Sequence, residues 1–374
     1  PDCITFLASG MNLLFFTLTT SLGIYILFVL FFLTGLRRIK TNEKNITSWP
    51  TVAIVIAARN EEINLPNIFQ DLAQLDYPKE LLDIVIVDDR STDNTWSLIK
   101  HFSDQHAHIH GVPIKEKSPS MTPKKYALTT AIEQSKGEYI LSTDADCRIP
   151  QSWVKSMVKL LEEGVGITVG SSTIGSSKHS SFIHYQLVDF LALVTANAGA
   201  MGWDFYWTGS GQNLAYKRKL FEEIDGFNPV RDRISGDDIY LVQSIGKKYG
   251  CAFNPDSGSF IKTSPSSSIR EFISQRIRWS SNSRFAAKTD LFFLLFLFNA
   301  FLMNSTILVG IFTPRLYSIL PMVFGLKFVS DALVVFSGAA KLHLTFPSII
   351  FILWSIVQPF YIPFIGLAGL VGRF

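Results

Sequence analysis

Residues 137–147 read Gly-Glu-Tyr-Ile-Leu-Ser-Thr-Asp-Ala-Asp-Cys. The apolar, β-type part of this stretch predicts a strand that ends in two carboxylates, Asp144 and Asp146, separated by Ala145. Side chains two apart on an extended backbone point to the same side, so we expect both carboxylates to converge on one hard cation and on the diphosphate that it bridges. An isolated Asp-x-Asp triplet more often lies in a solvated turn, so this assignment depends on the other motifs of the chain.

Two further strands are predicted upstream of this stretch. Residues 51–58 (Thr-Val-Ala-Ile-Val-Ile-Ala-Ala) and 82–87 (Leu-Asp-Ile-Val-Ile-Val) are apolar runs rich in β-branched residues, which is typical of strands buried on both faces. Arg-Asn-Glu-Glu at 59–62 follows the first run and is expected to open a helix that ends near residue 75. The alternation of strands and helices predicts an α/β sandwich with a mainly parallel sheet, in which ligands bind at the carboxyl ends of the strands.

Polar residues follow the predicted strands. Residues 88–95 read Asp-Asp-Arg-Ser-Thr-Asp-Asn-Thr, and a carboxylate there can accept from a base-ring N–H or a ribose hydroxyl, whereas Asp89 or Ser91 can also simply cap the next helix. Lys124 and Lys125 stand at a predicted helix start, where one of them could reach a phosphate and either could equally be a solvated surface residue. No glycine-rich dinucleotide or P-loop motif follows either strand, which argues against nicotinamide binding and ATP hydrolysis.

Two later motifs supply a candidate sugar-binding wall and a candidate base. Aromatic residues precede Gly-Ser-Gly-Gln-Asn at 209–213, and flat rings beside amides suit a sugar, although tryptophans are equally typical of a membrane interface. Asp237 and Asp238 begin a predicted helix, where their mutual repulsion can raise one pKa toward that of a general base. The alternative for this pair is a favourable charge at a helix N-terminus.

Composition places the protein in a membrane. Of its 374 residues, 48% are hydrophobic and only 17% are charged, and the apolar residues gather at the two ends. Four segments are long and apolar enough to span a bilayer: about 11–36, 291–313, 317–340 and 345–372. The basic residues that flank these segments are Arg37, Arg38, Lys40, Lys44, Arg284, Lys288, Lys341 and His343. By the positive-inside rule, we expect residues 37–290 in the cytoplasm.

Other features of the sequence limit the function further. Lys327 and Asp331 lie one helical turn apart inside the third predicted span; such residues are functional candidates, but a pair that neutralises itself is the simpler interpretation. The net charge of +3, without a basic stripe interleaved with aromatics, argues against a nucleic-acid partner. Three scattered cysteines exclude a disulfide framework or a cysteine zinc site. The opening Pro1-Asp2-Cys3 indicates a natural chain that begins upstream or differs from this start.

Taken in chain order, the motifs resemble those of membrane-bound family 2 glycosyltransferases, a group that includes cellulose and hyaluronan synthases and ceramide glucosyltransferases. The resemblance covers about residues 50–285 and rests on Arg-Asn-Glu-Glu, Asp-Asp-x-Ser-Thr-Asp-x-Thr, Asp-x-Asp, Gly-Asp-Asp and Gln-x-x-Arg-Trp. It implies a GT-A fold, a Rossmann-like mixed sheet inserted between N- and C-terminal transmembrane helices. The implied parts are an anchor at 1–36, a cytoplasmic GT-A domain at 37–268, an amphipathic interfacial helix at 269–289 and a C-terminal membrane domain at 290–374.

The resemblance also implies a reaction. Such an enzyme binds a nucleotide-sugar, usually a UDP-sugar, with Mg²⁺ or Mn²⁺, and transfers the sugar with inversion. Asp238 matches the catalytic base, with Asp237 beside it; many relatives have Glu-Asp there, so the choice between the two rests on alignment. The expected donor-binding residues are Ala58, Glu61, Asp88, Asp89, Lys125, Asp144 and Arg278; the metal ligands are Asp144 and Asp146; the acceptor-binding residues are Gln212, Asn213, Gln275 and Trp279.

Three functions remain open. The first is transfer of one sugar to a lipid or lipid-linked acceptor at the cytoplasmic face of a bacterial plasma membrane, and it is the one we prefer. The second is processive polysaccharide synthesis, for which four spans are few because extruding synthases enclose the polymer in a larger bundle. The third is a non-catalytic membrane scaffold, which the presence of every carboxylate that the chemistry requires argues against.

Overall fold

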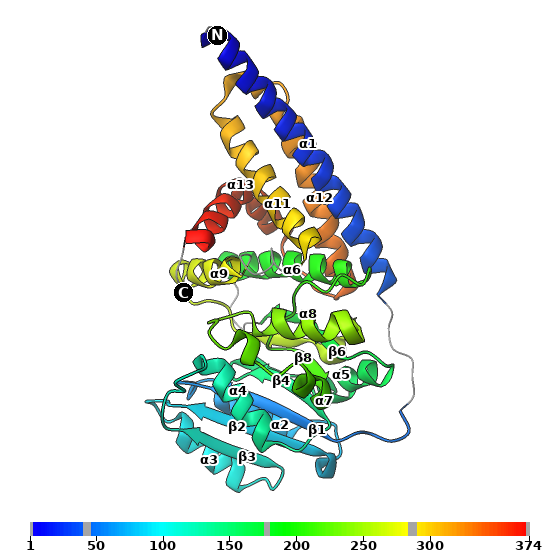
Figure 1. Ribbon diagram of the computed structural model, residues 1–374, viewed down its shortest axis with the longest axis vertical. Coiled ribbons are helices and arrows are strands. Elements are labelled where there is room, and N and C mark those ends of the chain that lie inside the picture. Colours follow the sequence, from blue (N-terminus) through cyan, green and yellow to red (C-terminus); the bar gives the residue numbers. More distant parts are fainter. Residues whose placement is uncertain (1–2, 40–45, 176–179, 283–289, 372–374) are drawn as a thin grey trace. The chain divides into compact units, whose positions relative to one another are not determined.

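The computed structural model describes residues 3–39, 46–175, 180–282 and 290–371, with side chains from residue 12 onward. Contacts divide the chain into two compact units, which are described separately. The helical unit comprises Pro1–Arg37, Lys178–Ala200 and Ser266–Phe374, and the α/β unit comprises Arg38–Ser177 and Met201–Pro265. Figure 1 labels helices and strands of both units where there is room.

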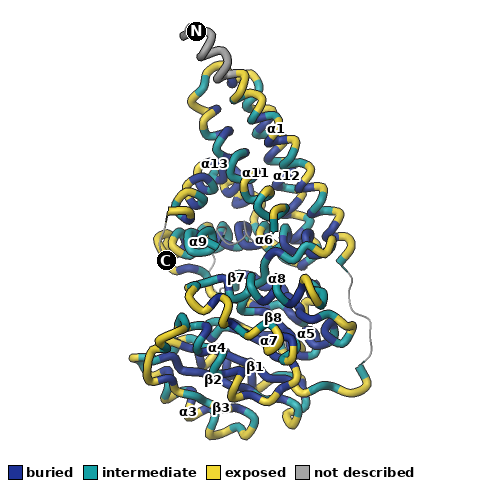
Figure 2. Tube along the Cα trace, in the orientation of Figure 1, coloured by how far each residue is buried: buried dark blue, intermediate teal, exposed yellow. Residues whose placement is uncertain are grey.

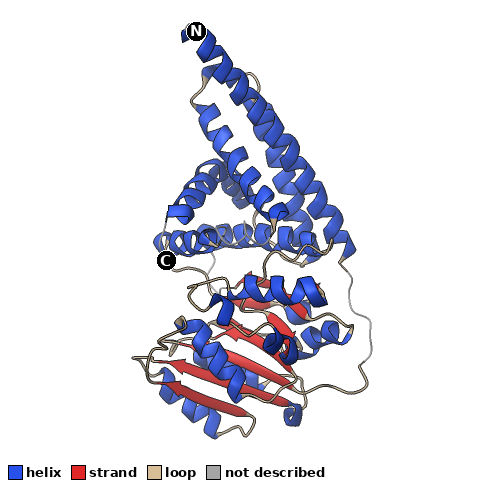
Figure 3. Cartoon of the chain, viewed as in Figure 1, coloured by secondary structure: helices blue, strands red, loops and turns tan. Residues whose placement is uncertain are grey.

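The α/β unit is built on a seven-stranded sheet in the order β3-β2-β1-β4-β8-β6-β9. Figure 3 draws the strands in red. Strand β8 is antiparallel to its neighbours β4 and β6, and the other pairs are parallel. The mainly parallel sheet that the sequence predicts is thus confirmed. The strands are β1 (Val52–Ala58), β2 (Leu82–Asp89), β3 (Ile109–Ile114), β4 (Tyr139–Asp144), β6 (Ile167–Gly170), β8 (Leu214–Lys217) and β9 (Cys251–Asn254).

A second, three-stranded sheet and six α-helices complete the described part of this unit. The small sheet has the order β5-β10-β7, with β5 (Cys147–Arg148), β10 (Ile261–Thr263) and β7 (Ser172–Ile174). The helices are α2 (Leu65–Ala73), α3 (Thr95–Asp104), α4 (Pro123–Gln134), α5 (Trp153–Glu162), α7 (Arg218–Glu223) and α8 (Asp237–Tyr249), with short 3₁₀ turns at Lys79–Leu81, Asn228–Val230 and Ser257–Ser259. Helix α4 packs on β1 and β2, and α5 packs on β6 and β8.

The central strands are buried on both faces, as their continuous apolar runs predict (Figure 2). Every residue of β1 except Ala57 is buried, and so is every residue of β2 except Asp83. Alternate residues of the two strands, among them Ile54 and Ile84, belong to the main hydrophobic cluster under the sheet. This packing fixes the carboxyl ends of the strands, where the candidate polar residues stand.

Two local expectations for the α/β unit are wrong. Helix α2 begins at Leu65, because residues 59–64 form a loop in which Asn60 has a left-handed backbone (φ 56°). Strand β4 ends at Asp144, and Ala145 and Asp146 form a turn. The side chains of Asp144 and Asp146 therefore do not share one face of a strand, as we expected, and their relative position is set by the turn.

Among its described residues, the helical unit contains four helices that are long and apolar enough to cross a membrane, in the positions that the sequence predicts. They are α1 (Cys3–Arg38), α11 (Leu291–Ile311), α12 (Leu320–Lys341) and α13 (Ser348–Val371), beside α6 (Ser181–Met201), α9 (Ile269–Ser281) and a 3₁₀ turn at Pro314–Leu316. Of the flanking basic residues, Lys40, Lys44, Arg284 and Lys288 lie outside the described residues, as does the end of the expected interfacial helix.

Helix α6 differs from the expected domain boundaries. We expected one continuous α/β domain over 37–268, but the contacts of α6 place it in the helical unit. A Cβ added at Gly199 would lie 2.5 Å from the carbonyl oxygen of Phe32, and a Cβ at Gly338 would lie 1.8 Å from Oγ1 of Thr195. These distances show that α6 packs closely against α1 and α12.

Lys327 and Asp331 form an ion pair at 2.6 Å, and both side chains are almost completely buried. The Tyr25 hydroxyl of α1 donates to the second oxygen of Asp331 at 2.6 Å. The pair therefore neutralises itself within α12, which is the simpler of the two interpretations of the sequence, and it also links α12 to α1.

Candidate active site

The carboxyl ends of β2, β1 and β4 form one row of candidate residues. Ala58 is paired in register with Asp88, and Ala57 is paired with Asp144. Because the three strands are parallel neighbours, the two carboxylates lie on either side of the end of β1. The structure thus brings together the predicted donor-binding residues Ala58, Asp88 and Asp144.

Asp88 and Asp89 differ in whether their carboxylate oxygens already have hydrogen-bond partners. Asp88 is buried, and its Oδ1 has no hydrogen-bond partner among the described residues. A buried oxygen without a partner costs about 1–3 kcal/mol, a cost that a donor group of a ligand would remove. Asp89 instead forms a bidentate ion pair with Arg90, at 2.7 and 2.9 Å. Asp88 is therefore the stronger candidate for a nucleoside contact.

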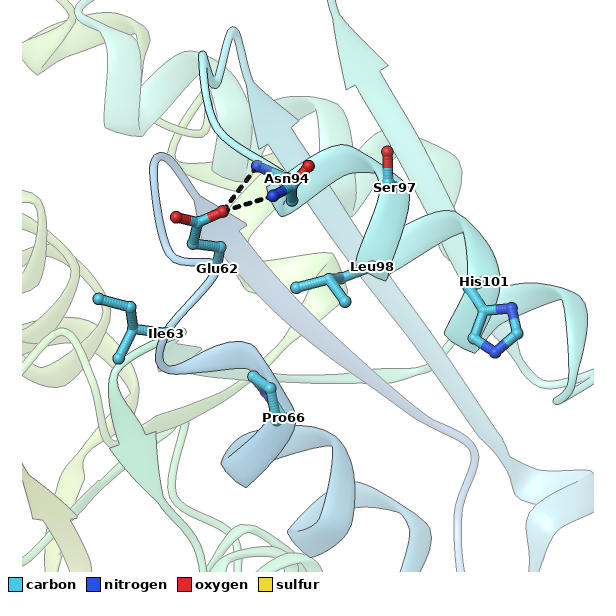
Figure 4. A pocket seen from close by; sticks show the side chains of 7 residues that line it. All are labelled: Glu62, Ile63, Pro66, Asn94, Ser97, Leu98 and His101. Atoms are coloured by element: carbon cyan, nitrogen blue, oxygen red, sulfur yellow. Dashed lines mark hydrogen bonds between the residues drawn. The ribbon is translucent and has the colours of Figure 1, made fainter.

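The loops that follow β1 and β2 hold each other in place. The Glu61 N–H donates to Thr95 Oγ1 at 2.8 Å. The Glu62 carboxylate accepts from the backbone N–H and the side-chain amide of Asn94, at 3.0 and 2.9 Å (Figure 4). The Arg-Asn-Glu-Glu motif and the motif after β2 are thus one structural element, and this element fixes Glu61 near the row of strand ends.

A surface depression of about 520 Å³ lies beside these loops, between α2 and α3. Its lining residues are Glu62, Ile63, Pro66, Asn94, Ser97, Leu98 and His101 (Figure 4). None of the predicted site residues lines this depression, so we place the candidate chemistry at the strand ends.

A surplus of carboxylates surrounds the turn after β4. Burial and the charge of Asp144 raise the pKa of Asp146. Burial also raises the pKa of Glu61, against a lowering hydrogen bond from Asn64, and the charges of Asp146 and Asp144 raise it further. Such a group of carboxylates favours a bound cation, and carboxylate oxygens are the ligands that Mg²⁺ and Mn²⁺ prefer.

Asp144 and Asp146 fit a divalent cation that takes its remaining ligands from elsewhere. Within the described ranges, no group of three or more His, Cys, Asp or Glu side chains is placed to hold a metal. Mg²⁺ is commonly bound by one or two carboxylates together with water and substrate phosphates. The two aspartates therefore suit a cation that is completed by the phosphates of a donor.

The turn that carries Asp146 is fixed by an ion pair that the sequence did not indicate. Asp71 of α2 accepts from Nε and Nη2 of Arg148, both at 2.6 Å. The Cys147 thiol donates to Oε1 of Gln212 at 3.6 Å. Gln212, predicted as an acceptor-binding residue, thus contacts the residue that follows the Asp-x-Asp motif.

Asp237 and Asp238 begin helix α8, as the sequence predicts. Gly236 precedes them with a left-handed backbone (φ 86°) that glycine adopts without strain. Burial and the charge of Asp237 raise the pKa of Asp238 to about 7, while hydrogen bonds from the backbone of Ile239 and Gly211 act in the opposite sense. A carboxylate with this pKa can accept a proton near neutral pH.

The two lysines at the start of α4 have different environments, and the prediction chose the less suitable one. Lys125 is fully buried, and its Nζ donates to the carbonyl oxygen of Arg233, which makes a contact with donor phosphates unfavourable. Lys124 is partly exposed and forms an ion pair with Asp144 at 2.7 Å. Burial opposes the charged form of Lys124, but the charges of Asp144, Asp237 and Asp238 outweigh this effect and raise its pKa.

Asn213 is a structural residue, not an exposed acceptor contact. Its Oδ1 accepts from the indole N–H of Trp153 at 2.9 Å, and its Nδ2 donates to the carbonyl oxygens of Ser171 and Ser259 at 2.7 and 2.8 Å. The side chain is fully buried, so its amide has no surface to offer a sugar. The prediction of Asn213 as an acceptor-binding residue is therefore corrected.

The remaining predicted residues, Gln275, Arg278 and Trp279, lie on helix α9 of the helical unit. The Gln275 side chain accepts from the neighbouring Arg276, and the Trp279 ring packs near Phe190 of α6, with 6.0 Å between ring centroids. These contacts are internal to the helical unit.

Comparison with known proteins identifies the α/β unit. The model of the family described as "Glycosyl transferase family 2" matches residues 53–226, which include the strand ends and the Asp-x-Asp turn. Residues 53–226 thus resemble glycosyltransferase family 2, and the match covers 174 of the 374 residues. One similar protein is a Bacillus subtilis protein named "Probable glycosyltransferase YdaM", which is 27% identical over an alignment of 290 residues that covers 73% of this chain and 67% of the relative.

Other relatives and a solved structure extend the comparison. The β-monoglucosyldiacylglycerol synthase of a Synechocystis strain is 27% identical over 232 residues, 58% of this chain and 45% of the relative. The chain thus spans about two thirds of YdaM and about half of the Synechocystis protein. The mannosyltransferase PcManGT of Pyrobaculum calidifontis, solved in complex with GDP-Man and Mn²⁺, matches 96% of this chain and 98% of its own at 19% identity with a TM-score of 0.57. This likeness shows the GT-A fold.

Proposed function

We propose that this protein is a family 2 glycosyltransferase that moves a sugar from a nucleotide-sugar of the UDP type to a lipid or lipid-linked acceptor, with inversion and with Mg²⁺ or Mn²⁺ as cofactor. The observation that carries the proposal is the row of carboxylates at the ends of β2, β1 and β4, inside the region that matches the family model. The raised pKa of Asp238, in the same unit, supports it. A lipid acceptor is supported by the four apolar helices and by relatives named β-monoglucosyldiacylglycerol synthase.

The donor would be held at the strand ends. The unpartnered Oδ1 of Asp88 would accept a hydrogen bond from the base or the ribose. Asp144 and Asp146 would hold the cation, which when bound neutralises charge on the donor diphosphate. Lys124 adds a positive charge beside Asp144, and a phosphate oxygen could replace the carboxylate as its partner.

Asp238 would act as the general base. Its carboxylate accepts the proton of the acceptor hydroxyl while that oxygen forms a bond to the anomeric carbon and the bond from this carbon to the diphosphate oxygen breaks. Attack from the side opposite the leaving group inverts the configuration of the sugar. In this proposal Arg278 neutralises the departing diphosphate, and Gln275 and Trp279 bind the acceptor.

We place the reaction at the cytoplasmic face of a plasma membrane. Arg37 and Arg38 end helix α1, and Lys341 and His343 end or follow α12. Basic residues at these ends favour the cytoplasmic side. A nucleotide-sugar made in the cytoplasm would then reach the α/β unit directly.

The test is a transfer assay on membranes that contain the protein. Radiolabelled UDP-glucose, UDP-N-acetylglucosamine, UDP-galactose and GDP-mannose are supplied in turn, and the product is separated by size and by partition into organic solvent. Asp238→Asn removes the base, and Asp232→Asn, an exposed carboxylate outside the proposed site, is the matched control. Chelation of divalent cations is tested in parallel.

We expect a small labelled product that partitions into organic solvent, depends on Mg²⁺ or Mn²⁺, persists in Asp232→Asn and is reduced by at least about a hundredfold in Asp238→Asn. A large water-soluble or insoluble polymer would mean a processive synthase. Product formation that survives Asp238→Asn would show that Asp238 is not the base.

A further inference from the structure

The helical unit contains a buried ion pair that joins α6 to α9. Nε of Arg276 lies 2.8 Å from Oδ2 of Asp189, and their side chains are only 5% and 6% exposed. Arg276 lies inside the Gln-x-x-Arg-Trp motif, between Gln275 and Arg278. The motif that we expect to contact the acceptor is therefore anchored by a carboxylate from another helix.

A third helix completes this anchor. The indole N–H of Trp354 on α13 donates to Oδ1 of Asp189 at 3.1 Å. Both oxygens of Asp189 thus have a partner, one from α9 and one from α13. The carboxylate holds three helices of the unit at one point.

The rest of the Arg276 guanidinium group faces two predicted acceptor-binding residues. Nη1 of Arg276 donates to Oε1 of Gln275 at 2.7 Å. Its Cζ lies 4.2 Å from the centroid of the Trp279 ring, which is a cation–π contact. Phe190, next to Asp189 in sequence, packs beside the ring of Trp279 in a tilted arrangement, with 6.0 Å between centroids. One guanidinium group therefore fixes the orientation of both residues.

Stability alone does not explain such an arrangement. A buried ion pair loses solvation, and apolar side chains of similar volume are often as stabilising. What a planar guanidinium provides, and apolar residues do not, is a fixed direction for each of its hydrogen bonds.

We propose that Asp189 and Trp354 are positioning residues that act through Arg276 to hold Gln275 and Trp279 in the orientation that the acceptor meets. The role of Gln275 and Trp279 in acceptor binding rests on the proposed function. The orientation that Arg276 gives to these two side chains does not. Its consequence is that helices α6 and α13 of the helical unit determine how well an acceptor binds.

The first experiment measures kinetics of purified full-length variants. Asp189→Asn keeps the size of the side chain and removes its charge, Trp354→Phe keeps an aromatic ring but is smaller and has no N–H to donate, and Asp189→Glu keeps the charge. We expect Asp189→Asn to raise the acceptor KM about tenfold and Trp354→Phe to raise it about threefold, because small displacements of positioning groups weaken binding. Asp189→Glu should recover part of the loss, and the donor KM should stay within about twofold of the wild-type value.

The matched control is Asp331→Asn, which disrupts an equally buried ion pair in the same unit. We expect this variant to lower the thermal stability without changing the acceptor KM. An acceptor KM that is unchanged in Asp189→Asn, or raised as much in Asp331→Asn, would overturn the proposal.

A second experiment does not depend on the reaction. Fluorine NMR of fluorotryptophan-labelled protein reports on each indole ring, and Trp279→Phe identifies the signal of Trp279. We expect this signal to shift or broaden in Asp189→Asn and to remain in place in Asp331→Asn. An unchanged signal in Asp189→Asn would overturn the positioning role whatever the acceptor is, whereas a shifted signal in a protein that transfers no sugar would count against the proposed function only.

Discussion

Asp238 is a residue at which activity and stability should depend on pH in opposite directions. Its pKa is raised to about 7, and an unfolded aspartate has a pKa near 4. Between these two values the folded protein keeps a proton that the unfolded chain has lost, so the free energy of unfolding falls as the pH rises through this window. Asp238 can act as a base only after it has lost that proton, so activity should rise as the pH rises through the same range.

We therefore expect kcat/KM for sugar transfer to increase with pH up to about 7 and then to level off. Asn at position 238 carries no charge at pH 8. We therefore expect the free energy of unfolding of Asp238→Asn at this pH to exceed that of the wild type by about 1 kcal/mol, which raises the unfolding temperature by a few degrees. Thermal unfolding at pH 5 and pH 8 checks this. A variant that is less stable at pH 8 would show that the charged form of Asp238 is stabilised in the folded protein.

Lys124 and Lys125 make a pair of neighbouring substitutions with different expected effects. Lys124→Gln removes a charge at the strand ends, so we expect the donor KM to rise about tenfold with little change in stability. Lys125→Gln shortens a fully buried side chain that bonds to the Arg233 carbonyl, so we expect a loss of about 1–3 kcal/mol in stability. Donor kinetics and thermal unfolding of both variants check this prediction, and the reverse pattern would assign the phosphate contact to Lys125.

At the scale of elements, the turn after β4 depends on helix α2. Asp71→Asn should break the bidentate pair with Arg148 and loosen the turn that carries Asp146. We expect the concentration of Mn²⁺ that gives half-maximal activity to rise about tenfold, as is usual when a supporting contact of a metal ligand is lost.

The control for this prediction is Asp76→Asn. Asp76 forms an exposed ion pair with Lys155 at 2.7 Å, and pairs of this kind contribute little to stability. We expect its metal dependence to match that of the wild type. Equal metal dependence in Asp71→Asn and Asp76→Asn would show that the turn does not need α2.

The same elements show what could be predicted from the sequence. A β-type run followed by a carboxylate is a short-range pattern, and it was enough to place Asp88 and Asp144 at strand ends. The adjacent Asp237 and Asp238 were likewise enough to predict a helix start. Lys124 and Lys125 have the same chemistry in adjacent positions, and only the path of the distant segment near Arg233 decides which one is buried. Asn213 likewise carries an amide that suits a sugar, and its partners lie about 40–60 residues away along the chain.

At the scale of the whole molecule, the positive-inside rule leads to a prediction about orientation. His343 follows α12, and the exposed Tyr317 lies between α11 and α12. In a chain without Cys3, whose other cysteines are buried, we expect a thiol reagent that does not cross membranes to label Tyr317→Cys in intact cells. His343→Cys should be labelled only after the cells are opened. The opposite result would place the α/β unit outside the cytoplasm.

The packing of α6 has a practical consequence for protein production. A fragment that begins after α1 and ends before α9 looks like a self-contained water-soluble domain, yet it would still contain α6. The faces of α6 around Thr195 and Gly199, which α12 and α1 cover in the full chain, would then meet water. Such a fragment should aggregate unless detergent is supplied, and an excision that keeps the enzyme domain in solution would have to remove α6 and reconnect the chain across the gap.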